Sequence, residues 1–220
     1  MSDVHTGALA HHFEDVEQQR ETMTLGMWAF LASEVMFFGG LFASYLVYRV
    51  FWPDAFARAS QHLDVPLGTF NTAVLILSSL TMALAVRSGQ LGRGRQGAAW
   101  IAATAALALV FLGVKALEYA HKFHEGLVPG AGFGDEGTAA AANPDTELFF
   151  ALYFAMTGMH ALHMVIGLGI MAVVGWRSWR GRYGPDDHAG LEVTGLYWHF
   201  VDLVWIFLFP LLYLLGRHAS

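Results

Sequence analysis

The sequence contains no cysteine and carries little charge. The absence of cysteine excludes disulfide bonds, thiolate metal sites and a thiol nucleophile. Charged residues make up 14% of the 220 residues and hydrophobic residues make up 55%, whereas charged residues approach about a quarter of an ordinary soluble domain. The formal net charge is -6 and no basic strip is present, so we expect no nucleic acid partner. The low charge and the high hydrophobic content indicate a membrane protein.

The sequence contains long apolar runs. A spanning helix needs roughly 20 apolar residues. Five segments meet this requirement, at about residues 25–50, 67–87, 98–120, 147–175 and 196–216. The runs are continuous and do not alternate with a period of two, which excludes a transmembrane β-barrel. We therefore predict an all-α, polytopic membrane protein, in which a polar segment 1–24 precedes one bundle of five transmembrane helices in residues 25–216.

Basic residues are distributed unevenly between the two sides of this bundle. Seven fall on the side of the N-terminus: Arg20, Arg87, Arg93, Arg95, Arg177, Arg180 and Arg182. Four fall on the opposite side: Arg49, Arg58, Lys122 and Arg217. Because basic residues accumulate in cytoplasmic loops, we predict a cytoplasmic N-terminus and an outside C-terminus. The connection 121–146 is rich in Gly and Ala, which is typical of a flexible or variable linker.

Ionisable residues inside apolar spans are costly, so each is a candidate functional residue. Glu34 lies about nine residues into the first span, ~13 Å from its start. Lys115 and Glu118 are three residues apart near the end of the third span, so we predict an ion pair near the interface, with Lys115 reaching toward the head groups.

Three further ionisable residues occur around the start of the last span. Glu192, His199 and Asp202 are separated by seven and three residues and therefore share one helical face. We expect that face to look inward.

His160 and His163 lie three residues apart in the apolar stretch MTGMHALHMVIGL, on one face of a helix. With His199 and with Glu118 or Asp202, they would supply a histidine–carboxylate site for a first-row metal, as a membrane hydroxylase needs. The favoured interpretation is that each histidine donates to a carboxylate or carbonyl on an adjacent helix. A proton-relay role is the remaining alternative.

Five stretches on successive predicted spans carry a family resemblance. They are ASEVMFFGGLFASY, FNTAVLILSS, LEYAHKFHEG, TGMHALHMVIG and YWHFVDLVWIFLFPLLYL, in this order. Together they resemble subunit III of the haem-copper respiratory oxidases, over nearly everything from residue 24 to 216. Many members have seven spans, and this chain resembles the last five, as in the short form of the subunit.

The resemblance implies a non-catalytic subunit that holds no haem or copper and binds structural phospholipid. Its expected partners are oxidase subunits I and II, which carry haem and copper, with subunit IV as a further candidate. The expected location is the bacterial plasma (inner) membrane, where the complex would couple oxygen reduction to proton translocation.

The resemblance also implies roles for single residues. Glu34 matches a buried carboxylate linked to proton uptake, and Arg177 matches a position that contacts phospholipid head groups. The buried polar motif of the family corresponds to Glu118, His160, His163, Glu192, His199 and Asp202.

The electron donor of the complex depends on the branch of the family. The quinol branch tends to have Asp in place of Glu34, so the resemblance favours cytochrome c as the donor. Three alternatives stay open: a bo-type quinol oxidase, an accessory subunit of nitric oxide reductase, and a metal-dependent membrane hydroxylase.

Overall fold

A computed structural model describes residues 16–130, 133, 144–184 and 187–215. The helices in these ranges are α1 (Val16–Phe51), α2 (Pro53–Gln61), α3 (Val65–Gln90), α4 (Gly94–His124), α5 (Pro144–Trp179) and α6 (Ala189–Phe209), which continues as the π-helical segment η1 (Pro210–Leu214). The only β-pairing in the described ranges is an isolated bridge between Gly184 and Asp187. Five helices are long and apolar enough to cross a membrane, which confirms the all-α, five-span fold.

The helices extend past the predicted spans. α1 begins at Val16 and not near residue 25, and α6 begins at Ala189 and not near residue 196. A membrane span needs only about 20 apolar residues, but Glu, Gln and Arg also favour helix, so the helices continue beyond the apolar runs. Residues 16–24, which the sequence assigned to a polar segment, are therefore the first turns of α1. Residues 1–15 lie outside the described part.

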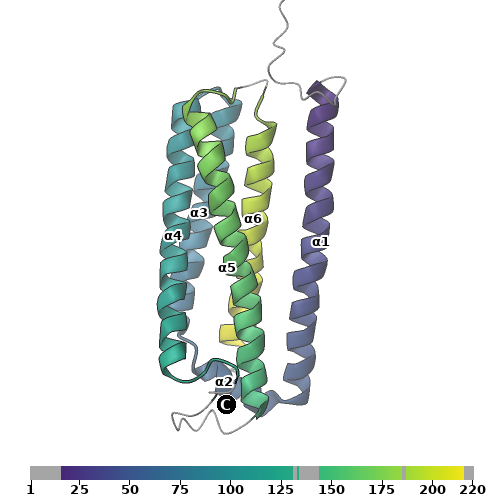
Figure 1. The fold of residues 1–220 in the computed structure, drawn as a ribbon, viewed down its shortest axis with the longest axis vertical. Coiled ribbons are helices and arrows are strands. Elements are labelled where there is room, and N and C mark those ends of the chain that lie inside the picture. Colours follow the sequence, from purple (N-terminus) through teal and green to yellow (C-terminus); the bar gives the residue numbers. More distant parts are fainter. Residues whose placement is uncertain (1–15, 131–132, 134–143, 185–186, 216–220) are drawn as a thin grey trace, which may run out of the picture.

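Helix α2 was not predicted, because nine residues are too few for a spanning segment. Proline at its first turn suits a helix start. Its buried face carries Phe56, whose ring lies 5.4 Å from the rings of both Tyr45 on α1 and Phe149 on α5. α2 thus anchors the end of α1 to the base of the bundle, where Figure 1 shows it.

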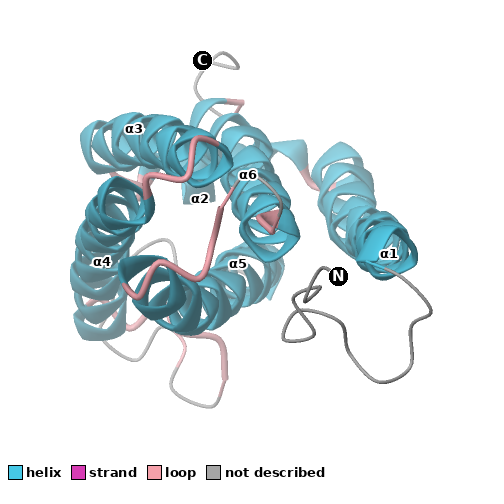
Figure 2. Cartoon of the chain, turned by 90° about the horizontal axis from the view of Figure 1, so that it is seen from above, coloured by secondary structure: helices cyan, strands magenta, loops and turns pink. Residues whose placement is uncertain are grey.

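Helices α3 to α6 form a four-helix bundle, and α1 stands beside it against α6 (Figures 1 and 2). In the apolar stretch of 18 residues within each span, 50% of the residues are buried in the span formed by α6 and η1, but only 17% are buried in α1. α1 meets the bundle through a narrow stripe in which Leu31, Phe38 and Tyr45 are buried. A repeat of seven residues is the spacing of a coiled-coil seam. We call this stripe the α1 seam.

Figure 1 shows the start of α1, the α3–α4 turn and the α5–α6 connection at one end of the molecule. The seven arginines of the more basic side belong to these segments and therefore gather at that end. The described residues of the connection 121–146 lie at the other end. There Gly126 and Gly130 have φ angles of 65° and 136°, which other residues rarely adopt. Most of its Gly/Ala tract, residues 131–132 and 134–143, lies outside the described residues.

Candidate functional site

Glu34 meets His163 between α1 and α5. Its carboxylate Oε2 lies 3.2 Å from the imidazole Nε2, with side chains 18% and 11% exposed respectively. Glu34 occupies the α1 seam between Leu31 and Phe38, and the Phe38 ring packs against the His163 ring at 5.4 Å. The intramembrane carboxylate therefore has a specific partner on the neighbouring helix. We call these two side chains the Glu34–His163 pair.

The hydrogen bonds of His163 determine how many protons this pair holds. Its Nδ1 lies 2.8 Å from the carbonyl oxygen of Met159. A carbonyl only accepts, so Nδ1 carries a hydrogen. The contact of Nε2 with Glu34 then joins two atoms that each have a lone pair, and it needs one proton between them. That proton belongs either to a carboxylic acid beside a neutral imidazole or to an imidazolium beside a carboxylate.

His160 has a different environment, although it lies one turn before His163. Among the described residues neither of its ring nitrogens has a hydrogen-bond partner. Its ring is packed 5.5 Å from the ring of Phe111 and 5.4 Å from that of Trp205. The prediction that each histidine donates to a carboxylate or carbonyl of an adjacent helix is therefore wrong for His160. Its ring faces the aromatic interior of the bundle, whereas His163 faces α1.

Glu118 and Lys115 form a buried ion pair inside the bundle, with side chains 4% and 5% exposed. The Lys115 ammonium donates to Glu118 Oε2 at 2.9 Å and to the hydroxyl groups of Tyr153 and Tyr213, both at 3.0 Å. These hydroxyl groups donate in turn to Glu118 Oε1, at 2.9 and 2.6 Å. All three N–H donors of the ammonium and both phenol hydrogens are used. We call these four side chains the Lys115 network.

The Lys115 side chain does not reach toward the head groups, so that prediction was wrong. Its Nζ lies 5.0 to 5.6 Å from the ring centroids of four aromatic residues: Tyr119, Tyr153, Trp205 and Tyr213. Aromatic ring faces attract cations. These rings come from α4, α5, α6 and η1, so the cage exists only once the helices have packed, and helical spacing alone does not reveal it.

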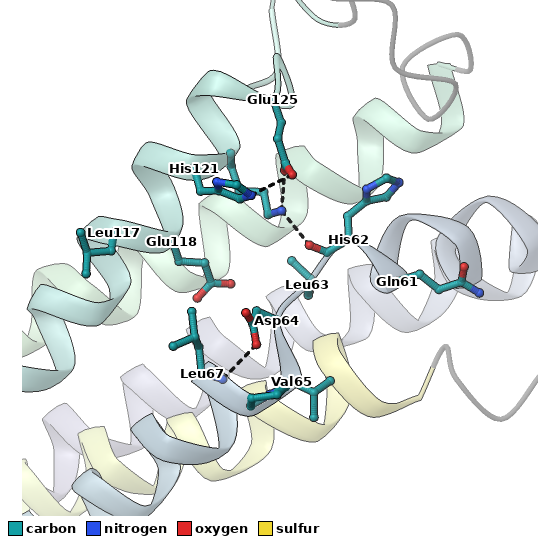
Figure 3. A pocket seen from close by; sticks show the side chains of 12 residues that line it. Gln61, His62, Leu63, Asp64, Val65, Leu67, Leu117, Glu118, His121 and Glu125 are labelled. Carbon is teal, nitrogen blue, oxygen red and sulfur yellow. Dashed lines mark hydrogen bonds and ion pairs between the residues drawn. The ribbon is translucent and has the colours of Figure 1, made fainter.

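A cavity of about 520 Å³, lined in part by Glu118, lies at the end of the bundle near α2. Figure 3 shows Glu118 and Asp64 facing it. Lys122 also lines the cavity, and it donates to the carbonyl of His62 at 2.7 Å and to Glu125 at 2.6 Å. The cavity formed by the end of α4 and the α2–α3 connection therefore borders Glu118 of the Lys115 network.

The three candidate residues of α6 hydrogen-bond to α3. The contacts join Glu192 to Gln90 at 2.8 Å, His199 to Ser79 at 2.7 Å and Asp202 to Ser78 at 3.4 Å. Glu192 also lies 3.2 Å from His188 and 3.8 Å from Arg20 of α1. The shared face of α6 is thus turned toward α3. Asp202 is buried, whereas Glu192, with a 30% exposed side chain, lies at the bundle end.

The histidine–carboxylate set considered for a metal is dispersed. His163 contacts α1, His160 lies between aromatic rings and His199 contacts α3. In the part of the chain that the structure describes, no three His, Asp or Glu side chains are grouped as metal ligands. A hydroxylase centre therefore has no assembled ligand set there.

Arg177 is exposed in the last turn of α5. Trp176 and Trp179 beside it are 58% and 65% exposed, and the Arg180 guanidinium lies 4.3 Å from the centroid of the Trp176 ring. Exposed tryptophans next to arginines are typical of the level of lipid head groups. This end of α5 has the composition of a membrane interface.

Tyr153 and Tyr213 were missed by sequence reasoning. Both stand inside apolar runs, where a phenol hydroxyl usually requires a hydrogen-bond partner. That rule marks them as polar candidates. It does not reveal that Lys115 and Glu118 are their common partners.

Comparison with known proteins identifies the family. A family model for cytochrome c oxidase subunit III matches residues 2–128 and 135–217. Cytochrome c oxidase subunit 3 of Thermostichus vulcanus is 39% identical over 88% of this chain and 87% of its own length, and that of Synechocystis sp. is 37% identical over 86% and 74%. Cytochrome bo(3) ubiquinol oxidase subunit 3 of Pseudomonas aeruginosa is 28% identical over 98% and 95%. The chain belongs to the cytochrome c oxidase subunit III family and is a multi-pass subunit of a haem-copper oxidase.

Proposed function

We propose that this chain sustains proton uptake by a cytochrome c oxidase, through the Glu34–His163 pair, while the chemistry of oxygen reduction takes place on partner subunits. The partners are oxidase subunits I and II, with subunit IV as a further candidate. The complex lies in a bacterial plasma membrane, with the N-terminus of this chain in the cytoplasm. Haem and copper belong to the partners.

The observation that carries this proposal is the contact of 3.2 Å between Glu34 Oε2 and His163 Nε2, with Nδ1 of the same ring on the Met159 carbonyl. This arrangement holds one proton that can sit on either partner without breaking the contact. Histidine and glutamate within membranes are the usual groups of proton relays. The Glu34 side chain is 18% exposed on the α1 seam, so this proton lies near the outer surface of the chain.

The test is Glu34→Ala in the whole oxidase. No redox group depends on Glu34, so haem content and initial electron transfer stay at the native level, while proton pumping falls or the active lifetime shortens. Val35→Ala is the matched control, because Val35 is adjacent and 59% exposed. Retention of this chain in the complex is measured alongside. Loss of the chain, with normal function in the complexes that retain it, would refute the proton role.

Cytochrome c is proposed as the donor. The cytochrome c oxidase relatives from Thermostichus vulcanus and Synechocystis sp. are 39% and 37% identical, whereas the quinol oxidase relatives from Pseudomonas aeruginosa and Staphylococcus saprophyticus are 28% and 30% identical. A quinol donor is the alternative. Purification of the complex in mild detergent decides between them: a partner with a binuclear copper centre supports cytochrome c, and its absence from an active quinol-oxidising complex contradicts it.

Phospholipid is proposed at Arg177. Its place in the last turn of α5, between two exposed tryptophans, supports a position of the guanidinium at head-group level. A phosphate group beside Arg177 in a structure of the lipid-embedded complex supports this role, and a guanidinium free in solvent contradicts it.

A further inference from the structure

A crevice opens between α3 and α6 on the outer face of the bundle. Its volume is about 250 Å³. Its rim is apolar and includes Ile76, Leu203 and Ile206, which are 57%, 49% and 43% exposed. Ser79 and His199 also line it, and Asp202 lies at the same level. A crevice with an apolar rim therefore contains hydrogen-bonding groups.

These polar groups lie deep in the spans. At 1.5 Å per residue, His199 is ~15 Å from the start of α6, and Ser79 is ~21 Å from the start of α3. Both positions are near the middle of helices that cross the hydrocarbon layer. A polar group left unpaired against lipid at that depth is costly. We therefore expect the polar groups in the crevice to have a further hydrogen-bonding partner.

His199 retains capacity for such a partner. Its Nδ1 contacts the Ser79 hydroxyl at 2.7 Å. Its Nε2 has no hydrogen-bond partner among the described residues. This atom is also not fully buried. The imidazole therefore presents a nitrogen toward the crevice. Asp202 adds acceptor capacity, because its contacts with the Ser78 hydroxyl are long, at 3.4 and 3.5 Å.

We propose that the α3–α6 crevice is the docking site for a transmembrane helix of another oxidase subunit, which places a hydroxyl or carboxamide side chain on His199. An acyl chain fills an apolar groove but cannot hydrogen-bond to an imidazole. The lining residues are spaced three and four apart on both helices, so they form the kind of groove that receives a ridge of side chains from a third helix. Membership in an oxidase subunit family means that partner helices exist.

The first experiment uses the absence of cysteine, since each introduced thiol is unique in this chain. Ile76→Cys and Leu203→Cys place a benzophenone label on the rim of the crevice. Leu109→Cys on α4 and Val173→Cys on α5, which are 60% and 57% exposed, are the controls. In the whole complex in nanodiscs, illumination should cross-link the two rim labels to one partner helix, identified by mass spectrometry. Rim labels that join only lipid, or controls that reach the same helix equally, would overturn the proposal.

The second experiment removes the hydrogen bond. His199→Leu should speed dissociation of this chain from the complex by about 3- to 15-fold, the range expected for one interhelical hydrogen bond in a membrane. His199→Gln keeps a donor and an acceptor and should restore much of the retention. Ser33→Ala is the control, because among the described residues that hydroxyl bonds only within α1, to the Phe30 carbonyl at 2.6 Å.

Retention of His199→Leu at the native level would contradict the proposal. Density for a lipid chain or a quinone ring in the crevice of the intact complex would contradict it as well. Near-ultraviolet circular dichroism of each variant checks that the bundle is folded. If His199→Leu does not fold, the His199→Gln variant and the cross-links still decide the question.

Discussion

Glu118 and Glu34 are both carboxylates within membrane-spanning helices, but their hydrogen bonds differ in kind. Glu118 lies inside the four-helix bundle and is held by Lys115, Tyr153 and Tyr213, with every donor in the group used. Glu34 lies on the α1 seam, where its carboxylate contacts the imidazole of His163. The first arrangement fixes each proton in place, whereas the second leaves one proton shared between two atoms. The number of hydrogen-bond donors around each carboxylate thus separates Glu118 from Glu34, for which we propose a proton role.

The packing is also tighter inside the bundle than along α1. A Cβ atom at Gly167 of α5 would lie 2.8 Å from the Trp198 ring, whereas a Cβ atom at Gly40 of α1 would meet nothing within 4 Å. The bundle interior is filled, and α1 is attached along one narrow stripe. A change in the bundle should therefore act on stability, and a change on the α1 seam should act on function.

The largest effect is expected for Lys115→Met. This change leaves the Glu118 carboxylate buried without its cation, and breaking a buried pair from one side costs about 3–5 kcal/mol. The free energy of unfolding of the purified chain in detergent measures the loss. Leu117→Met, at a 72% exposed position of the same helix, is the control. A Lys115→Met/Glu118→Gln double variant should recover part of the lost stability. Equal losses of stability in the single variant, the double variant and the Leu117→Met control would contradict the Lys115 network.

Two glycine substitutions should change the free energy of unfolding in opposite directions. Gly167→Ala forces a methyl group against the Trp198 ring and should lower the free energy of unfolding by about 1–3 kcal/mol. Gly40→Ala adds a methyl group in open space and should raise it by up to about 1 kcal/mol, because alanine favours helix more than glycine does. Thermal unfolding in detergent reports both. A loss of stability at Gly40 as large as that at Gly167 would contradict the difference in packing.

The smallest effect on stability is expected for Glu34→Gln. Replacement of one interhelical hydrogen bond in a membrane protein changes stability by about 0.6 kcal/mol on average, and glutamine can still bond to His163. The free energy of unfolding and the retention of this chain in the complex should both stay close to native. A loss near that of Lys115→Met would place Glu34 among the structural carboxylates.

Hydropathy and motif order were sufficient to predict five spans and the subunit family, because both follow from the composition of single segments. The ion pair between Lys115 and Glu118 was predicted and is present, but the further hydrogen-bond partners of these two side chains were not predicted. Lys115 and Glu118 are three residues apart, but Tyr153 and Tyr213, which complete their hydrogen bonds, come from α5 and η1. Which of two histidines on one helix faces α1 depends on how that helix is rotated in the bundle. These features arise from tertiary packing, which sequence spacing does not specify.

The central claim is that Glu34 and His163 act as one unit in sustaining proton uptake. A double-mutant cycle on the active lifetime of the whole oxidase tests it most directly, with Glu34→Gln, His163→Gln and the double variant measured in complexes that retain this chain. Because either change removes the shared proton, the account predicts that the double variant has the same shortened lifetime as each single variant. Lifetimes that shorten independently, so that the effects of the two changes multiply, would contradict it.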